Sequence, residues 1–296
     1  MLSILIPIYN YDVREFVSQL HNQTMQENID FEIIIADDAS ENKYRKKNSE
    51  LTGLKQVEYI QLEKNIGRSK IRNLLAEKAK YENLLFADCD MLIKNNNFIK
   101  SYINIQNSYS VICGGICYQK QEPKDKQLLL RWCYGIKREK KSAKNRSLNP
   151  YSSFMSGNFF IRENIFRQIQ FNENISKYGH EDTLFGIELQ RKNITIAHID
   201  NPLIHNGLED NNTFINKTKT GIENLIYISK NYNYPELYKK IKLLRISKKL
   251  FFLKPLIILT FIISENLILK NLKSKHPILF LFDFYKLGYY LKNKNS

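Results

Sequence analysis

The sequence predicts an α/β fold in which a Rossmann-like sheet is flanked by helices and followed by a helical C-terminal tail. Three observations support this prediction: strand and helix patterns alternate along the first ninety residues, polar residues follow the predicted strands, and the last sixty residues are both basic and apolar. Alternating strands and helices favour parallel pairing, with helices on both faces of the sheet. A chain of 296 residues, 43% of them hydrophobic, is long enough for one large domain and an appendage.

The individual elements follow from short apolar runs and from apolar residues at helical spacing. In the first half, the predicted strands are residues 2–7, 31–36, 57–62 and 83–87, and the predicted helices are residues 11–25 and 67–80. The second half is less regular. Its predicted strands are residues 110–118, 154–161 and 194–199, its predicted helices are residues 125–141, 180–192 and 213–230, and residues 137–149 form a basic loop.

Polar clusters follow all four predicted strands of the first half, at residues 7–10, 37–40, 65–67 and 88–90. Ligands of such sheets lie at the carboxyl ends of the strands, so this placement indicates an enzyme. Asp88 and Asp90 could both face one ligand, and carboxylate oxygens suit Mg²⁺ or Mn²⁺, which in turn suit diphosphate. A simple turn is the alternative, because aspartate is common in turns. The glycine-rich phosphate-binding patterns of dinucleotide folds and P-loops are absent after the first strand.

These clusters resemble the motifs of glycosyltransferase family 2, which has the GT-A fold with a mixed sheet and depends on a divalent cation. The resemblance covers residues 1–92 and rests on Pro7-Ile8-Tyr9-Asn10, Asp37-Asp38-Ala39-Ser40, Asn65-Ile66-Gly67 with Arg72-Asn73, and Asp88-Cys89-Asp90. The second half, to about His205, is similar to galactosyltransferase-type C-terminal regions. There Ser156-Gly157-Asn158 and Gly179-His180-Glu181-Asp182 stand at the acceptor-side motifs. The resemblance does not cover the tail.

The resemblance implies a role for each matched residue. The residues expected to bind the nucleotide sugar are Pro7, Tyr9, Asn10, Asp37, Asp38, Gly67, Arg72 and Asp88. Those expected to contact the acceptor or the sugar are Gly157, Asn158 and Glu181. Asp90 and His205 would bind the metal, and an imidazole ligand favours Mn²⁺ over Mg²⁺. A hydrogen-bonded structural histidine is the alternative for His205.

Asp182 matches the catalytic base of the family. It opens a predicted helix together with Glu181, where carboxylates are also favoured by the helix dipole and by capping. In an inverting transfer, the acceptor hydroxyl attacks the anomeric carbon opposite the diphosphate, so one base and one electrophile are needed. We therefore expect an inverting transferase that uses a UDP-sugar, since a carboxylate at Asp38 can accept the N3–H of uracil but is repelled by the unprotonated N3 of cytosine.

The tail is strongly basic. From residue 237 onward, thirteen lysines and arginines stand against two acids, so the tail carries +11 of the total charge of +15. Its apolar run, residues 250–263, contains Lys254 and Pro255 and is shorter than the twenty or so residues that span a bilayer. Two interpretations stay open: a surface that lies on anionic lipid, or a helical subdomain that packs on the main domain or forms a homodimer. We do not expect a nucleic-acid partner, because the charge follows apolar helices and no recognised binding motif is present.

The expected organisation is one GT-A domain at residues 1–235 and a tail at residues 236–296. Within the domain, residues 1–92 would bind the nucleotide sugar and residues 93–235 the acceptor. The expected product is a surface glycan, made on a carbohydrate or lipid-linked acceptor. The rival functions are a polyprenyl-phosphate glycosyltransferase and an inactive lectin-like or scaffold protein. No secretory leader pattern precedes the first strand, so we expect a cytoplasmic protein with reduced cysteines. If the tail binds lipid, the protein is peripheral on the cytoplasmic face of the membrane.

Overall fold

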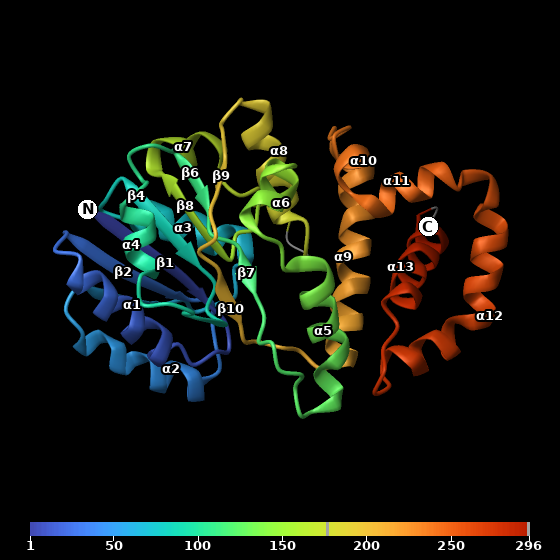
Figure 1. Ribbon diagram of the computed structural model, residues 1–296, viewed down its shortest axis with the longest axis horizontal. Coiled ribbons are helices and arrows are strands. Elements are labelled where there is room, and N and C mark those ends of the chain that lie inside the picture. The colour runs from blue at the N-terminus through green and yellow to red at the C-terminus, as the bar shows by residue number, and fades with distance from the viewer. Residues whose placement is uncertain (176–177, 295–296) are drawn as a thin grey trace. The chain divides into compact units, whose positions relative to one another are not determined.

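The structure, a computed structural model, describes residues 1–175 and 178–294 (Figure 1). The chain divides into two compact units. The first unit contains residues 1–119, 140–175 and 181–207, and the second contains residues 120–139, 178–180 and 208–294. All four cysteines are free thiols, as expected.

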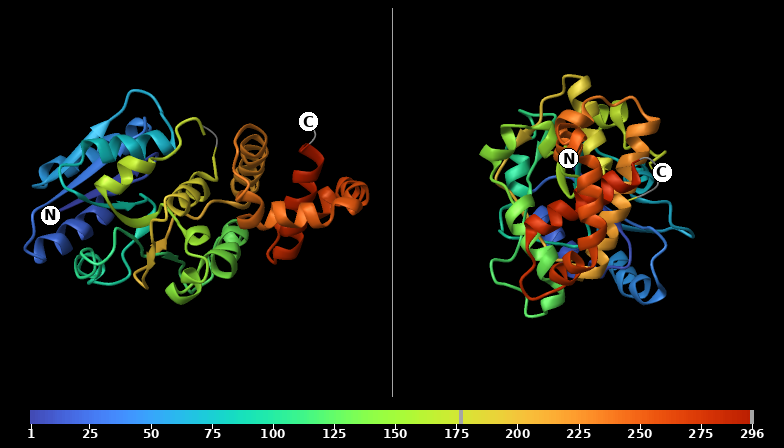
Figure 2. Two further views of the ribbon diagram at one scale, coloured as in Figure 1. Left: turned by 90° about the horizontal axis from the view of Figure 1, so that it is seen from above. Right: turned by 90° about the vertical axis from the view of Figure 1, so that its right-hand side faces the viewer.

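Four parallel strands form the first part of the main sheet, which is seen from above in the left panel of Figure 2. They are β1 (Leu2–Ile8), β2 (Phe31–Asp37), β3 (Val57–Gln61) and β4 (Asn83–Ala87). β1 pairs with β2 and β4, and β2 pairs with β3. The intervening helices are α1 (Arg14–Gln26), α2 (Asn42–Asn48) and α3 (Arg68–Lys78). The predicted strands and both predicted helices are confirmed. α2 was not predicted, because it is polar and buries only Asn48, which leaves no apolar spacing to detect.

Three further strands complete the main sheet, and one of them runs antiparallel to its two neighbours. β8 (Asn158–Arg162), β6 (Val111–Cys113) and β9 (Ala197–His198) give the order β3-β2-β1-β4-β8-β6-β9. β8 runs antiparallel to both β4 and β6, so the sheet is mixed, as the resemblance implied. A second sheet has the order β5-β10-β7 and consists of β5 (Met91–Leu92), β10 (Leu203–His205) and β7 (Ile116–Cys117).

Two expectations for the second half were wrong in detail. The strand expected at residues 110–118 is broken into β6 and β7 by Gly114 and Gly115. Gly115 has φ +82°, and a Cβ at Gly114 would lie 2.6 Å from the backbone oxygen of Asn201. The expected basic loop contains α6 (Ala143–Ser147), in which Arg146 is buried and donates to the backbone oxygens of Gly114 and Ile199.

The remaining helices of the first unit are α4 (Phe98–Ile103), α7 (Glu163–Ile169) and α8 (Glu181–Arg191). The prediction of a helix at residues 180–192 is confirmed by α8. Beneath α7 and α8 lies an aromatic core in which Phe86 stacks on Phe159 with ring centroids 4.8 Å apart. Phe171 and Phe185 extend it by a second stack, at 4.5 Å. This core supports the ends of β4 and β8, where the candidate site lies.

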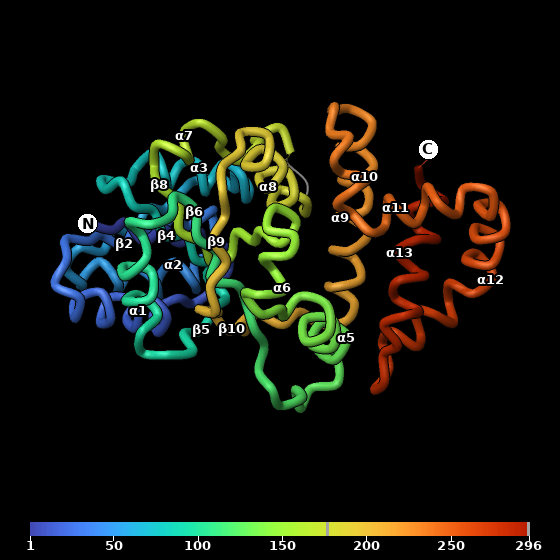
Figure 3. Tube along the Cα trace, turned by 45° about the horizontal axis from the view of Figure 1, so that its top comes forward, coloured from blue at the N-terminus to red at the C-terminus, as the bar shows by residue number. Residues whose placement is uncertain are grey.

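In the described residues of the second unit, all the secondary-structure elements are helices (Figure 3). Its helices are α5 (Leu129–Tyr134), continued by a π-helical turn at Gly135–Glu139, then α9 (Asn211–Asn231), α10 (Leu237–Lys240), α11 (Lys242–Lys249), α12 (Lys254–Leu272) and α13 (Leu279–Asn293). Phe214 of α9, Phe261 of α12 and Phe282 of α13 share one buried cluster. Because α9 packs there, residues 208–235 group with the tail, whereas the sequence pattern had placed them in the first domain.

The apolar part of the tail is longer than expected. With the short 3-10 helix before it, α12 forms a continuous stretch at Phe251–Leu272 that is long and apolar enough to cross a membrane. The sequence argument stopped at Ile263 and counted Lys254 and Pro255 as interruptions. Both lie in the first turn of α12, where proline is tolerated because its missing N–H has no partner there anyway. The expected length was therefore wrong.

Candidate active site

The carboxyl end of β2 places two aspartates in different roles. Asp37 is fully buried, and its carboxylate accepts hydrogen bonds from the Ser40 backbone N–H (2.7 Å) and from the Tyr59 hydroxyl (2.6 Å). Asp38 accepts from the backbone N–H groups of Ile66 (2.6 Å) and Gly67 (3.0 Å). Burial raises the pKa of Asp38, and these two amides act against that rise. Asp38 therefore fixes the loop that precedes α3.

That loop needs its glycine. Gly67 has φ +86° and is the residue from which α3 begins, a conformation that a side chain would strain. The neighbouring loop after β1 is held in a similar way: the Asn10 backbone N–H donates to the Ser40 hydroxyl (2.8 Å), and the Glu41 N–H donates to the Asn10 side-chain oxygen (2.8 Å). The ends of β1, β2 and β3 are thus tied into one rim.

Two of the expected nucleotide-binding residues lie on this rim at the end of β1. Tyr9 is 54% exposed, so its ring is open to a ligand, and Pro7 is partly buried within the strand. The backbone N–H of Tyr9 hydrogen-bonds to the Cys89 side chain, so the loop after β1 adjoins the turn after β4. The structure therefore brings the first and fourth sequence clusters together.

Asp88 follows β4 and is paired with a buried arginine. The Arg72 guanidinium, 2% exposed, donates to the Asp88 carboxylate at 2.5 Å. Burial acts to raise the pKa of Asp88, but the positive charges of Arg72 and Arg68 outweigh it, so the pKa lies below its usual range. Gly157 packs against this carboxylate: a Cβ there would lie 3.0 Å from Asp88 Oδ2. The pair thus gives an ionised carboxylate at a fixed position.

Asp90 lies beside His205, as expected for two ligands of one metal ion. Asp90 Oδ2 is 3.3 Å from His205 Nε2, because β10 runs antiparallel to β5 with His205 opposite Met91. Burial and the charge of Asp88 raise the pKa of Asp90, although His205 opposes this. The second ring nitrogen of His205 is buried and has no hydrogen-bond partner within residues 1–175 and 178–294. One carboxylate oxygen and one imidazole nitrogen side by side fit a divalent cation.

The protein supplies only part of a coordination shell at this position. Among the described residues, no group of three or more histidine, cysteine, aspartate or glutamate side chains is placed to hold a metal ion. A cation bound by Asp90 and His205 would therefore need further oxygen ligands from elsewhere, and a diphosphate group offers them. Gly207 leaves room here, since a Cβ would lie 2.5 Å from Asp90 Oδ2.

The N-terminus of α8 carries the other two expected acidic residues. Asp182 Oδ2 accepts from the Ser156 backbone N–H at 3.1 Å, while Oδ1 is buried and without a hydrogen-bond partner in the described part of the chain. Burial and the neighbouring charge of Glu181 raise the pKa of Asp182 to about 6. Glu181 accepts from Arg68 at 2.8 Å. Burial acts to raise the pKa of Glu181, but the charges of Arg68 and Arg72 outweigh it and lower the pKa.

Asn158 is placed differently from the other expected residues. It is 1% exposed, and its side-chain oxygen accepts from the Tyr102 hydroxyl at 2.6 Å. Its side-chain nitrogen donates to the backbone oxygens of Gly115 (2.8 Å) and Asn201 (2.9 Å). With these hydrogen bonds made inside the protein, Asn158 holds three segments together behind the site and is not open to an acceptor.

Sequence reasoning missed Arg68 and Tyr11. Arg68 follows the Asn65-Ile66-Gly67 motif directly, and a cation at the start of a helix is unfavourable unless it has another partner, which was an available signal. That partner is Glu181, 113 residues away along the chain. Tyr11 lies near Asp90 and hydrogen-bonds to the Asn206 side chain, and burial raises its pKa. No pattern in the sequence pointed to Tyr11.

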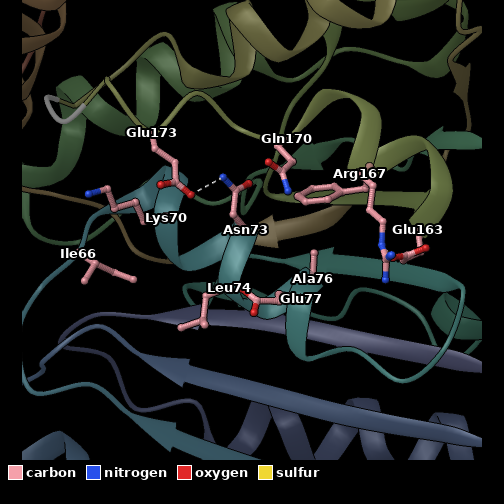
Figure 4. A pocket seen from close by; sticks show the side chains of 11 residues that line it. Ile66, Lys70, Asn73, Leu74, Ala76, Glu77, Glu163, Arg167, Gln170 and Glu173 are labelled. Atoms are coloured by element: carbon pink, nitrogen blue, oxygen red, sulfur yellow. Dashed lines mark hydrogen bonds and ion pairs between the residues drawn. The ribbon is translucent and has the colours of Figure 1, made fainter.

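A separate cavity of about 550 Å³ lies between α3 and α7 (Figure 4). Its lining includes Lys70, Glu77 and Arg167 but none of the expected site residues. Asn73 extends toward Glu173 in this view and donates to it at 2.9 Å, while its amide also pairs with the backbone of Phe171. Asn73, part of the third sequence motif, thus fixes the segment after α7 and does not face Asp88 or Asp182.

Comparison with known proteins identifies the family of this chain. The model of Glycosyl transferase family 2 matches residues 3–170. The uncharacterized glycosyltransferase YfnE of Bacillus subtilis (strain 168) is 24% identical over 241 residues, which cover 65% of this chain and 61% of that protein. The chain therefore spans about three fifths of the length of this relative.

Solved structures show the same fold. The mannosyltransferase PcManGT from Pyrobaculum calidifontis, in complex with GDP-Man and Mn²⁺, matches with a TM-score of 0.55 and 11% identity, over 81% of this chain and 67% of that one. S. aureus TarS 1–349 matches with a TM-score of 0.50 and 16% identity, over 100% of this chain and 92% of that one. The expected GT-A fold is confirmed. Because the family model covers more than half of the sequence, this chain belongs to glycosyl transferase family 2.

Proposed function

We propose that this protein is an inverting, metal-dependent glycosyltransferase, which moves a sugar from a UDP-sugar to a carbohydrate or lipid-linked acceptor in surface glycan biosynthesis. One observation carries the proposal: two carboxyl groups of the site have their pKa values displaced in opposite directions. Asp88 beside Arg72 has a lowered pKa, and Asp182 has a pKa raised to about 6. Such a separation supports an ionised binding group at Asp88 and a base that can take up a proton at Asp182.

Asp182 would act as the base. The acceptor oxygen attacks the anomeric carbon while the bond from that carbon to the diphosphate breaks, and UDP leaves with the bonding electrons. The hydroxyl proton passes to the Asp182 oxygen that has no hydrogen-bond partner in the described residues. At pH 7 a group with a pKa of about 6 is mostly ionised, yet it is a stronger base than an ordinary aspartate. A single displacement of this kind inverts the anomeric configuration.

The rim formed by the first three strand ends would hold the nucleoside. Each carboxylate oxygen has two lone pairs, so Asp38 can accept the N3–H of uracil while it keeps its hydrogen bonds to Ile66 and Gly67. Asp37 is buried and holds the turn after β2, because its carboxylate accepts a hydrogen bond from the Ser40 backbone N–H. The exposed ring of Tyr9 would pack against the base or the ribose. Asp88, fixed by Arg72, would accept hydrogen bonds from the ribose or the donor sugar.

Asp90 and His205 would hold the divalent cation, with Mn²⁺ favoured over Mg²⁺ because imidazole suits manganese better. When bound, the cation would stabilise the charge on the departing diphosphate. The complex of PcManGT with Mn²⁺ is consistent with a cation in this fold.

The acceptor would approach between Asp182, Glu181 and Gly157, with Asn158 supporting them from behind. Polyprenyl phosphate itself as the acceptor is the second candidate, favoured by the exposed apolar side chains of α12. Analysis of the product separates the two, because only the second joins the transferred sugar directly to the lipid phosphate. A lectin-like protein without activity would bind UDP-sugars and release no UDP.

A panel of UDP-sugars tests the proposal. The full chain is incubated with each donor in the presence of Mn²⁺, of Mg²⁺ or of a chelator, and released UDP is measured. We expect release with at least one UDP-sugar, faster with Mn²⁺ than with Mg²⁺ and absent with the chelator. Release that is indifferent to the chelator would contradict the metal site. Release of GDP from GDP-sugars in place of UDP would contradict the donor assignment.

A further inference from the structure

The second unit carries an apolar stripe along α12. Its side chains are 56–92% exposed and recur every three or four residues, which places them on one face of the helix. The α12 stripe consists of Phe252, in the 3-10 helix Phe251–Leu253 that runs into α12, and of Leu256, Leu259, Ile263 and Leu267 of α12 itself. The opposite face of the helix is already used, since Phe261, Ile268 and Leu272 are buried in the cluster shared with α13. α12 is therefore apolar on two faces, one of which is open.

This exposure is concentrated in one part of the protein. Of the seventeen large hydrophobic side chains that are exposed in the described residues, ten lie between residues 251 and 280. Single exposed apolar residues are ordinary on a protein surface, but a continuous patch marks an interaction site. The α12 stripe thus needs an apolar partner.

Exposed cations flank the stripe at both ends. Lys248 and Lys249 precede it, and Lys270, Lys273 and Lys275 follow it, all of them exposed. The only acidic residue of α12, Glu265, lies 3.8 Å from Lys292 of α13. The partner must therefore be apolar along its middle and negatively charged on both sides, which describes an anionic lipid surface.

We infer that α12 lies in the plane of an anionic bilayer, with its apolar stripe among the acyl chains and its terminal lysines at the lipid headgroups. Between Phe252 and Leu267 the helix rises about 22 Å, so the two groups of cations are far enough apart to reach headgroups on either side of the stripe. This binding is independent of the transfer reaction.

Two other occupants fit less well. A second copy paired about a two-fold axis would bring cationic ends against cationic ends, whether the two helices ran parallel or antiparallel. A membrane-crossing α12 satisfies the length and composition. However, its inner face packs on α13, and crossing would bring the charged Asp283 and Lys286 of that helix toward the bilayer interior.

Vesicle flotation tests the inference. The full chain is mixed at low salt with phosphatidylcholine vesicles, alone or with phosphatidylglycerol added. We expect binding to the anionic vesicles only, weakened but not abolished by high salt, because the inserted apolar side chains are not screened. A protein that ignores anionic vesicles at low salt would overturn the inference.

Matched variants separate the two contributions. The apolar variant F252S/I263S should bind anionic vesicles at least tenfold more weakly, and its control M25S/L148S, exposed apolar residues of the first unit, should bind as the wild type does. The charge variant K249E/K270E/K273E should bind anionic vesicles at least about a hundredfold more weakly than the wild type does. Its control K46E/K55E/K100E has the same net charge on exposed positions of the first unit and should stay within about threefold of the wild type. Thermal unfolding checks that all variants fold.

Each remaining outcome is decisive. If the tail variants and their controls lost vesicle binding equally, net charge alone would drive binding. That result would refute the inference that one face of α12 binds the membrane. A dimer that F252S/I263S dissociates, without vesicle binding by the wild type, would assign the stripe to a second copy. Protein that stays with the vesicles in high salt and in alkaline carbonate would indicate a crossing helix. Release of the wild type from the vesicles by carbonate, together with loss of vesicle binding in both tail variants but in neither control, supports in-plane binding.

Discussion

Replacing Asp182 with asparagine should make the protein both more stable and nearly inactive. The substitution keeps the shape of the side chain and its ability to accept from the Ser156 backbone N–H. It removes a negative charge that is buried beside Glu181, and it removes the atom that would take up the acceptor proton. For a residue that serves only the fold, the change in stability would have the opposite sign, because replacing such a residue lowers the free energy of unfolding.

The size of the effect follows from the pKa. Burial and Glu181 raise the pKa of Asp182 from 3.8 to about 6, and a shift of about two units corresponds to about 3 kcal/mol. Between pH 3.8 and 6 the folded state binds more protons at this group than the unfolded state does. The free energy of unfolding therefore falls as the pH rises through this window, and the full destabilisation is present above pH 6. Asp182→Asn should thus raise the stability at pH 7.5 by up to about 3 kcal/mol.

Thermal unfolding of the wild type and of Asp182→Asn at pH 7.5 and at pH 4.5 measures this difference. We expect the variant to melt up to about 5 °C higher at pH 7.5, and the gap to shrink at pH 4.5, where Asp182 in the folded wild type is protonated. Turnover should fall by about 10²–10⁴ while UDP affinity is kept. The rate of the wild type should rise with pH up to an apparent pKa of about 6 and then level off.

Two results would refute this reasoning. Near-normal turnover of the asparagine variant would remove Asp182 from the reaction. A variant that is less stable than the wild type at pH 7.5 would show that the ionised carboxylate is favourably held, contrary to a raised pKa. The two results are independent, because stability can be measured without any knowledge of the acceptor.

The other substitutions test the rest of the site. Asp88→Asn leaves the charge of Arg72 buried without its partner, so the free energy of unfolding should fall by about 2–4 kcal/mol in urea titration; an unchanged midpoint would contradict the pairing. In calorimetry, Asp90→Ala should abolish the Mn²⁺ dependence of UDP binding, and His205→Ala should weaken it. If both variants kept the Mn²⁺ dependence of the wild type, these two residues would not bind the metal. Asn158→Ala loses three internal hydrogen bonds, so the free energy of unfolding should fall by about 2–3 kcal/mol. UDP affinity should be kept in the folded protein. A variant with unchanged stability but poor use of the acceptor would indicate that Asn158 contacts the acceptor.

The strands that carry the donor side of the site could be predicted because each is an apolar run that ends at polar residues. β1, β2 and β4 are almost wholly buried, and Asp38 and Asp88 stand directly after two of them. Parallel pairing then brings these ends to one edge without any knowledge of long-range contacts. For this reason Asp38, Asp88 and Asp90 were placed correctly at the ends of their strands from local pattern and resemblance.

The elements that were missed lack such a pattern. β5 has only two residues, too few to show an alternation, and α2 and α6 expose most of their polar residues. The role of Arg68 depends on Glu181 in a distant segment, which only the tertiary fold reveals. Asn158 shows the reverse case: the resemblance marked the residue, but only the packing around it shows that its amide faces inward.

The tail was predicted as helical and basic from composition, but its length was underestimated at Lys254 and Pro255. These residues interrupt an apolar run in the sequence, yet a helix accepts both in its first turn. Which faces of α12 are open could not be predicted, because apolar residues occur on every side of the helix and no single polar side marks the solvent. Burial of Phe261 against α13 is needed to see that Phe252 and Ile263 remain exposed.

The anomeric configuration of the first product tests the central claim most directly. The full chain is incubated with Mn²⁺ and an active UDP-α-sugar, with water as the slow acceptor, and the anomeric proton of the released sugar is followed by NMR before mutarotation. The account predicts that the β-anomer forms first, that a chelator stops its formation, and that Asp182→Asn forms it far more slowly. An α-anomer that forms first, or a rate indifferent to the chelator and to Asp182, would contradict the account.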